Sequence, residues 1–329
     1  MSTLISIIIP NYNGSATIGK CLAAAYASAD DNFEVVVIDD SSVDNSAEII
    51  KEFPCKLIRL DEHAGASRAR NVGAQNSSGE ILFFIDADCL VLEKSLAMVR
   101  QTLAEKGASV IIGGTYTAMP YDQGFFSTFQ SVFINYFETK NPGSPDYIAT
   151  HAMVIDAGTF RKSGGFVEDF LPILEDVEFS HRLRRQGCSL YMNPEILVRH
   201  IFNFSFGRSM RNAIRKSRFW TEYSARNRDL LADSGTASIE LKINVVTAFI
   251  IMGLFVVGHF FQETALLYPV VPLFVFNLFV NRKLLGAYRR VGGLSLLIPA
   301  TIYYTLPYSM AVGYGAAAGI TRYLWGRRG

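Results

Sequence analysis

Short apolar runs alternate with helically spaced segments through the first ninety residues of the chain. Each run has five or six residues, is rich in Ile, Val or Leu, and ends in a polar turn. This alternation predicts buried strands of a mostly parallel α/β sheet that is covered by helices on both faces. The predicted strands are 5–9, 33–38, 56–60 and 81–85, and the predicted helices are 15–29, 44–53 and 66–75.

The last third of the chain follows a different pattern. Residues 243–262, 264–281 and 291–321 contain no Asp, Glu, Lys or Arg. A helix needs about 20 apolar residues to cross about 30 Å of hydrocarbon, so three such runs in succession favour membrane segments over buried core helices. The pattern thus predicts three parts: an α/β domain at 1–205, a basic amphipathic interfacial segment at 206–240, and a transmembrane domain of about three segments at 241–329.

The distribution of basic residues predicts a topology. The N-terminal apolar run is too short for a signal peptide, so we expect the first domain in the cytoplasm. The loop after the second segment then returns inside, as the positive-inside rule requires. Its basic residues are Arg282, Lys283, Arg289 and Arg290. Arg322, Arg327 and Arg328 would lie outside after a third crossing, or inside if the last, proline-containing segment re-enters, and both possibilities stay open.

Two further segments have the character of membrane-facing helices. One is an aromatic stripe that suits either core packing or the headgroup layer. It consists of Phe125, Phe126, Phe129, Phe133, Tyr136 and Phe137. The other is a basic helical face formed by Arg208, Arg211, Arg215 and Arg218. It predicts contact with an anionic lipid surface or with the diphosphate of an acceptor, against the alternative of a solvated helix.

Composition narrows the class of protein. Half of the residues are hydrophobic and 19% are charged, against about 25% in ordinary soluble domains, which excludes disorder, collagen and a disulfide scaffold. The net charge of +1 points to no particular partner, and we expect no nucleic acid. Four scattered cysteines lack the paired spacing of a metal cluster or a disulfide framework and suit a reducing cytosol: Cys21, Cys55, Cys89 and Cys188.

Polar residues follow three predicted strands directly, at 11–13, 39–40 and 86–88. In parallel sheets, ligands bind beyond the carboxyl ends of the strands, so these clusters should converge. Asp86 and Asp88 could share a divalent cation that bridges phosphates, or could be solvated acids in a turn. Asp39 and Asp40 could accept hydrogen bonds from a nucleobase or ribose, or cap the next helix.

Other charged residues have a structural and a functional interpretation each. Arg70 could face a base or a phosphate, or form a salt bridge. Glu175 and Asp176 could supply a general base, or stabilise the N-terminus of a helix. His151 and His200 are isolated, and a lone histidine is more often structural than a ligand, although His200 also ends a predicted strand.

Seven motifs together resemble the family 2 glycosyltransferases in order and spacing, over roughly residues 5–200. They are SIIIPNYN at 6–13, VVVIDDSSVD at 35–44, GASRARNVG at 65–73, ILFFIDAD at 81–88, GGF at 164–166, EDVE at 175–178 and VRH at 198–200.

The resemblance implies a GT-A fold, a nucleotide-sugar donor, a Mg²⁺ or Mn²⁺ ion, inversion at the anomeric carbon, and C-terminal membrane helices. The candidates for binding the donor, for which a UDP-sugar is the commonest choice, are Pro10, Tyr12, Asn13, Asp39, Asp40, Arg70 and Asp86. The metal is expected on Asp88, with Asp86 and His200 near it. The catalytic base is expected to be Asp176, beside Glu175.

The expected acceptor follows from the acid pair. A polyprenyl phosphate is already ionised and needs no base, so Glu175 and Asp176 favour a hydroxyl on a lipid-linked saccharide or a glycolipid. The stretch 211–220 lacks the Q-x-x-R-W signature of processive synthases, which predicts transfer of one sugar. We therefore expect a multi-pass inner-membrane enzyme of envelope polysaccharide synthesis. The alternatives are a polyprenyl phosphate glycosyltransferase and a non-catalytic nucleotide-sugar-binding adaptor.

Overall fold

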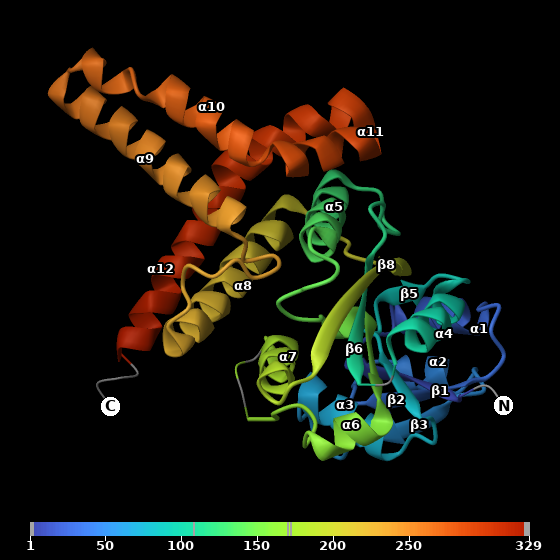
Figure 1. The fold of residues 1–329 in the computed structure, drawn as a ribbon. Coiled ribbons are helices and arrows are strands. Elements are labelled where there is room, and N and C mark those ends of the chain that lie inside the picture. Colours follow the sequence, from blue (N-terminus) through green and yellow to red (C-terminus); the bar gives the residue numbers. More distant parts are fainter. Residues whose placement is uncertain (1–2, 108, 170, 172, 326–329) are drawn as a thin grey trace. The chain divides into compact units, whose positions relative to one another are not determined.

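The computed structural model describes residues 3–107, 109–169, 171 and 173–325 (Figure 1). The chain divides into two compact units. The first comprises Met1–Gln123 and Glu138–Phe202, and the second comprises Gly124–Phe137 and Asn203–Gly329. The last of the three breaks, after Phe202, lies near residue 205, where the sequence predicts the end of the α/β domain, but the membership of Gly124–Phe137 in the second unit has no counterpart in the prediction. Arg327 and Arg328 lie outside the described residues.

The first unit contains an eight-stranded mixed sheet of order β3-β2-β1-β4-β7-β6-β8-β5. The four predicted strands are confirmed and form its parallel half, in which β1 pairs with β2 and β4, and β2 with β3. In the other half β7 runs antiparallel to β4 and β6, and β5 antiparallel to β8. The strands are β1 (Ile5–Asn11), β2 (Phe33–Asp39), β3 (Lys56–Arg59), β4 (Ile81–Phe84), β5 (Cys89–Val91), β6 (Val110–Tyr116), β7 (Met153–Asp156) and β8 (Ser189–His200).

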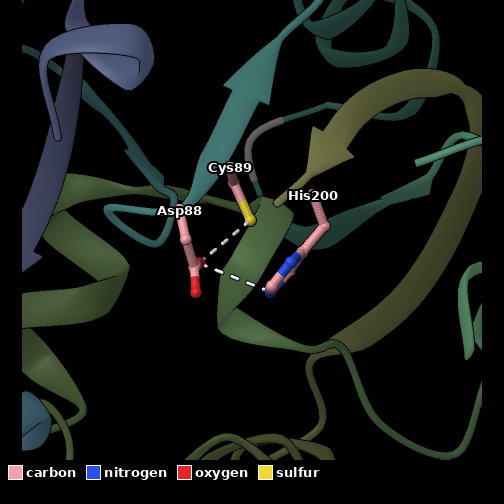
Figure 2. Close-up of side chains that lie close together, drawn as sticks. All are labelled: Asp88, Cys89 and His200. Atoms are coloured by element: carbon pink, nitrogen blue, oxygen red, sulfur yellow. Dashed lines mark hydrogen bonds and ion pairs between the residues drawn. The ribbon is translucent and has the colours of Figure 1, made fainter. Parts of the chain in front are cut away.

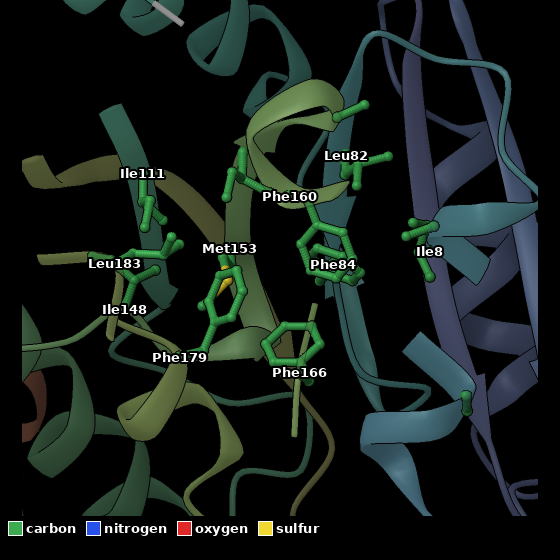
Figure 3. Close-up of a cluster of buried hydrophobic side chains, with 14 of the residues drawn as sticks. Ile8, Leu82, Phe84, Ile111, Ile148, Met153, Phe160, Phe166, Phe179 and Leu183 are labelled. Atoms are coloured by element: carbon green, nitrogen blue, oxygen red, sulfur yellow. The ribbon is translucent and has the colours of Figure 1, made fainter. Parts of the chain in front are cut away.

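Helices pack on this sheet because its central strands are apolar on both sides. Ile8, Phe84 and Met153 are fully buried, and they pack with Phe166 and Phe179 in one hydrophobic cluster (Figure 3). The cluster fixes the frame from which the polar strand ends emerge. The helices of this unit are α1 (Ile18–Tyr26), α2 (Ser46–Ile50), α3 (Ala66–Gln75), α4 (Ser95–Lys106), η1 (Thr150–Ala152), α6 (Ala157–Lys162) and α7 (Glu175–Arg185).

The second unit is helical and is held together by aromatic rings. The predicted aromatic stripe lies on α5, where Phe129 and Phe133 are buried. Phe129 stacks on Tyr288 at a centroid distance of 5.2 Å and meets Tyr303 edge-on at 4.7 Å, so this part of the stripe is core. The elements are α5 (Phe125–Thr139), α8 (Phe206–Asn227), α9 (Ile239–Phe261), η2 (Thr264–Leu267), α10 (Val270–Val280), α11 (Arg282–Tyr303), η3 (Tyr304–Tyr308) and α12 (Ser309–Trp325).

The predicted membrane segments fold differently from one another. Only α9, with 23 residues and a mean hydropathy of 2.1, is a single described helix long and apolar enough to cross a bilayer. The second segment divides into η2 and the 11-residue α10, and the third is broken at Gly292 and Gly293 and again by the π-helical turn η3. The described residues thus hold one candidate span, or up to two if each bent pair counts as one.

Candidate active site

The Asp-Ala-Asp segment links the two halves of the sheet. It follows β4 and runs directly into β5, whose Cys89 pairs in register with His200 at the end of β8. Asp88, Cys89 and His200 therefore come together, with one potential ligand atom of each within 4.8 Å of the others (Figure 2). His200 Nε2 lies 3.4 Å from Asp88 Oδ1. A carboxylate and an imidazole suit Mn²⁺ well, so Asp88 and His200 fit the expected cation.

The charges around Asp88 also favour a bound cation. Burial, and then the negative charge of Asp86, raise the pKa of Asp88 to about 7. A divalent cation would relieve both effects by stabilising the ionised carboxylate. Asp86 itself stays ionised. Burial opposes its charge, but Arg70, His151 and His200 together outweigh burial and lower the pKa of Asp86.

Arg70 joins the predicted metal-binding segment to Glu175, the neighbour of the predicted base Asp176. Its side chain is only 4% exposed, and it donates from Nη2 to Asp86 Oδ1 and from Nη1 to Glu175 Oε1, both at 2.7 Å. Both terminal nitrogens therefore already hold carboxylates from distant parts of the chain. The predicted contact of Arg70 with a nucleotide stays a prediction, whereas its role in positioning two acids is visible in these bonds.

Glu175 and Asp176 form the first turn of α7, as the sequence predicts for a helix start. The turn is preceded by Leu174 at φ +80°, a left-handed conformation that is costly for a leucine. Asp176 Oδ1 accepts a hydrogen bond from the Val177 N–H at 2.8 Å. Burial and the adjacent Glu175 raise the pKa of Asp176 to about 7, although Arg70 opposes the shift. A carboxylate with that pKa is a suitable proton acceptor near neutral pH.

The three aspartates share one cationic neighbour. His151 acts on Asp86, Asp88 and Asp176 alike, in each case lowering the pKa of the carboxyl. Its charge therefore affects all three carboxyls, although Asp86 and Asp88 follow β4 and Asp176 comes from a helix. The sequence predicts convergence of residues 11–13, 39–40 and 86–88, and the Asn11 Nδ2 to Asp39 Oδ1 hydrogen bond of 3.1 Å joins the first two of these clusters.

His151 is held in place by a buried pair. Its Nε2 lies 3.3 Å from Glu138 Oε2, and Glu138 also accepts a hydrogen bond from Thr115 Oγ1 at 2.7 Å. Its ring stacks on Tyr116 at 4.0 Å, and Tyr116 in turn meets His200 edge-on at 4.9 Å. Burial disfavours a charged imidazole, but Glu138, Asp86 and Asp176 together outweigh burial and raise the pKa of His151.

Asp39 and Asp40 both accept hydrogen bonds from neighbouring parts of the chain. Asp39 is fully buried and accepts hydrogen bonds from Asn11 Nδ2 and from Arg59 Nε, both at 3.1 Å. Asp40 accepts the N–H groups of Ala64 and Gly65, each at 2.8 Å, in the loop directly before α3. These bonds fix the loop before α3, and the alternative that Asp40 caps the next helix along the chain, α2, stays a prediction.

An exposed aromatic pair lies beside these acids. The ring of Tyr12, 49% exposed, stacks on His63 at 3.9 Å, and His63 Nδ1 lies 2.9 Å from Asp40 Oδ2. Pro10 is half-buried at the end of β1, and Asn13 uses its Oδ1 to accept the Val43 N–H at 2.9 Å. A flat ligand could stack on the Tyr12 ring, which is the arrangement a nucleobase requires.

The matched family agrees with this geometry. Residues 6–162 match the model of glycosyl transferase family 2. This stretch is a family 2 glycosyltransferase domain. GlyG of Streptococcus pneumoniae is 31% identical to the domain over 131 residues, a match that covers 38% of this chain and 44% of GlyG. AglE of Haloferax volcanii is 34% identical over 123 residues, or 35% of this chain and 40% of that protein.

A third relative has a name that states its reaction. It is the UDP-Glc:α-D-GlcNAc-diphosphoundecaprenol β-1,3-glucosyltransferase WfgD of Escherichia coli, 33% identical over 113 residues, which covers 33% of this chain and 45% of WfgD. The chain spans less than half the length of each of these three relatives.

Solved structures share the GT-A fold of this chain. The mannosyltransferase PcManGT of Pyrobaculum calidifontis, solved with GDP-Man and Mn²⁺, superposes with a TM-score of 0.59 over 98% of this chain and 87% of that one, at 16% identity. GalNAc-T7, solved with UDP, GalNAc and Mn²⁺, gives 0.50 over 67% and 50%, at 17% identity. At these identities the comparison concerns the fold alone.

Sequence reasoning missed several residues of the glycosyltransferase site. The spacing of the cysteines argues against a metal cluster, so the sequence gives Cys89 no role. In the structure Cys89 lies beside Asp88 and opposite His200. Glu138 and His63 belong to none of the sequence motifs. Their partners, His151 and Asp40, are found only in the three-dimensional structure. The sequence favours a structural role for His151, and its buried pair with Glu138 agrees with that role. The sequence gives no sign that His151 lowers the pKa values of three aspartates.

Proposed function

We propose that this protein transfers a single sugar from a nucleotide-sugar, with inversion, to a hydroxyl group of a lipid-linked acceptor at the cytoplasmic face of a membrane. The observation that carries the proposal is the position of Arg70, which donates hydrogen bonds of 2.7 Å to Asp86 and to Glu175 and so holds the Asp86–Asp88 segment near the start of α7, where Asp176 lies. Leaving-group stabilisation and proton removal need these two kinds of carboxylate close together.

At the donor end, Asp88 and His200 would hold a Mg²⁺ or Mn²⁺ ion. Such an ion supplies Lewis-acid stabilisation of the charge that develops on the departing nucleoside diphosphate. The remaining tasks fall to the chain itself. Tyr12 offers the exposed ring on which the base would stack, and Arg70 keeps Asp86 ionised and oriented beside Asp88. Mn²⁺ with GDP-Man or UDP in the two structural relatives supports this assignment.

At the acceptor end, Asp176 takes the proton. A sugar hydroxyl has a pKa far above neutral, so its oxygen becomes nucleophilic only if a positioned base removes the proton during attack. The attacking oxygen forms a bond to the anomeric carbon on the face opposite the departing phosphate, whose bond breaks in the same step. The anomeric configuration is therefore inverted, and Asp176 ends the reaction protonated.

Membrane attachment supports a lipid-linked acceptor. The 23-residue α9 is sufficiently long and apolar to cross a bilayer, and α8 before it exposes Arg208, Arg211 and Arg215, which suit an anionic lipid surface. The relative WfgD acts, by its name, on a diphosphoundecaprenol-linked sugar. We therefore place the enzyme in the inner membrane, with its glycosyltransferase domain on the cytoplasmic side.

A donor screen on the purified full-length protein tests the proposal. Nucleotide release would be measured with UDP-, GDP- and dTDP-sugars, Mn²⁺ and a bacterial lipid extract, and the product of the best donor would be analysed by NMR for its anomeric configuration. We expect one dominant donor and an inverted product with one added sugar. Retention of configuration would refute the single displacement.

Variants separate the proposal from its alternatives. Asp176→Asn should lower transfer by roughly 10² to 10⁴-fold. Near-normal transfer by this variant, with a polyprenyl phosphate as the preferred acceptor, would favour the polyprenyl phosphate glycosyltransferase. No turnover with any donor, together with measurable nucleotide-sugar binding, would favour the adaptor.

A further inference from the structure

The last helix of the chain packs closely along the basic helix α8. Gly315 and Gly319 of α12 face the α8 backbone, and a Cβ atom at either position would overlap a carbonyl oxygen, that of Ile214 or Arg218 respectively. This Gly-Ala-Ala-Ala-Gly segment is therefore a small-xxx-small seam that allows close approach of two helix backbones. The seam is used here within the second unit, between α12 and α8.

An ion-pair cluster joins the same two helices farther along. Glu222 of α8 is 2% exposed, and its two carboxylate oxygens meet Arg226 Nη2 at 2.5 Å and Arg322 Nε at 3.1 Å. Arg226 belongs to α8, whereas Arg322 lies in the last turn of α12. A buried carboxylate that lost one of these cations would be costly, so the pair holds the C-terminal end of α12 against α8.

The surface of α8 keeps this helix out of hydrocarbon. Arg208, Arg211, Arg215 and Lys216 are exposed on it. An arginine at the centre of a bilayer costs at least about 2.5 kcal/mol on insertion scales, so four exposed cations are incompatible with a spanning position. Because α12 lies along α8, its C-terminal end stays on the side of the bilayer on which α8 lies.

The apolar hairpin before α11 has the opposite character. Helices α9 and α10 lie side by side, tied by the Asn277 Nδ2 to Asn244 Oδ1 hydrogen bond of 2.8 Å (Figure 1). Large apolar side chains are exposed on both helices, including Phe255 and Val256 on α9 and Phe276 on α10. Such a surface suits acyl chains, and the 17 residues 264–280 are at the short limit of a return crossing.

Helix α11 leaves the line of the hairpin and carries an apolar stripe. The chain bends by 67° at the break before Arg282. Leu294, Ile298 and Ile302 of α11 and Leu306 of η3 then follow one another at intervals of four residues, each 55–61% exposed. Four basic residues are exposed on the part of α11 before the break at Gly292 and Gly293: Arg282, Lys283, Arg289 and Arg290. An apolar stripe next to a basic cluster is the pattern of a helix that lies in a membrane interface.

We propose that only the α9–α10 hairpin crosses the bilayer, and that α11 and α12 stay with α8 at the surface from which the hairpin enters. The stripe of Leu294, Ile298 and Ile302 on α11 and Leu306 on η3 lies in the acyl layer beneath anionic headgroups. The C-terminal end of α12 is then on the same side as α8. This inference rests on the membrane attachment in the proposed function, and it decides between the two topologies that the sequence leaves open.

Cysteine labelling of the full-length protein tests the topology. Gln262→Cys places a thiol at the tip of the hairpin, and Trp325→Cys places one at the end of α12. A membrane-impermeant maleimide should label the first in intact cells and the second only after permeabilisation. The unchanged protein is the control for its own thiols, of which Cys21 and Cys89 are buried. Equal labelling of both sites in intact cells would demonstrate a third crossing, and protection of both would refute the crossing hairpin.

Tryptophan quenching tests the stripe. Ile298→Trp, in vesicles that contain anionic lipid with brominated acyl chains, should lose most of the emission that it adds to the unchanged protein. Thr321→Trp, an exposed position on α12 beside Arg322, is the matched control and should keep its added emission. Equal quenching of the two would place α12 in hydrocarbon and overturn the proposal, as would the absence of quenching at Ile298→Trp.

Neither measurement requires transfer activity, so the two proposals can fail separately. A protein that shows this labelling pattern without transferring a sugar would refute the chemistry and leave the topology standing. A protein recovered entirely from the soluble fraction would refute membrane attachment itself.

Discussion

The pH dependence of transfer provides the sharpest test of the general base. Burial and Glu175 raise the pKa of Asp176 to about 7, well above the 3.8 of an ordinary aspartic acid. A base works only when ionised, so activity should fall as pH drops through that value. With a pKa near 7, roughly one-tenth of the base is ionised at pH 6 and about nine-tenths at pH 8, which predicts a roughly tenfold rise in kcat/KM. An aspartate of ordinary pKa would give no change over this range.

The assay must separate Asp176 from Asp88, whose pKa is also about 7 when no cation is bound. Initial rates of nucleotide release would be measured from pH 5.5 to pH 8.5, with saturating acceptor and several Mn²⁺ concentrations at each pH. A midpoint that stays fixed as Mn²⁺ increases belongs to the base. A midpoint that moves to lower pH with increasing Mn²⁺ reports competition between protons and metal at Asp88, and would refute the assignment to Asp176.

Glu175 offers a directional check on the same reasoning. Removing its negative charge in Glu175→Gln removes one cause of the raised pKa and frees Arg70 to act more strongly on Asp176, so the midpoint should move to lower pH. Glu178→Gln is the matched control, because Glu178 lies on the same helix and pairs with Arg182 at 2.9 Å. An equal shift in both variants, or none in Glu175→Gln, would contradict the electrostatic account.

Three other perturbations have definite expected outcomes. Asp88→Asn should abolish Mn²⁺-dependent binding of UDP or GDP measured by calorimetry, and unchanged affinity would exclude Asp88 as a ligand. Tyr12→Ala should raise the KM for the nucleotide-sugar roughly threefold to tenfold with kcat nearly constant, as expected for a lost stacking contact, whereas a fall in kcat alone would argue against it. Asn277→Leu, which breaks hydrogen bonds to Asn244 and Asn281, should destabilise the second unit by ~1 kcal/mol, seen as a lower Tm in detergent than that of the control Val275→Leu.

Local patterns were sufficient for the parallel half of the sheet. Its strands are short, apolar and separated by helices, so each could be located from the residues themselves, and helix 66–75 has the bounds that the sequence predicts. The other half, in which β6 and β8 are parallel and the remaining pairs antiparallel, depends on pairings between distant segments, such as Cys89 with His200, 111 positions later. Arg70 illustrates the same limit at the site, because its partner Glu175 lies 105 residues away. The sequence shows that a buried arginine needs an acidic partner, but only the fold determines which acidic residue that is.

Residues 291–321 show why a run without charged residues does not by itself identify a membrane span. Residues 291–321 lack charged side chains for two different reasons. In α11 the exposed Leu294 and Ile298 suit an apolar environment, whereas in α12 the small residues Gly315 and Gly319 are required by contact with α8. A hydropathy window adds these contributions together and indicates one span. Only the pairing of Arg322 with a buried carboxylate on a basic helix distinguishes a surface helix from a crossing one, and that pairing depends on the packing of α12 along α8.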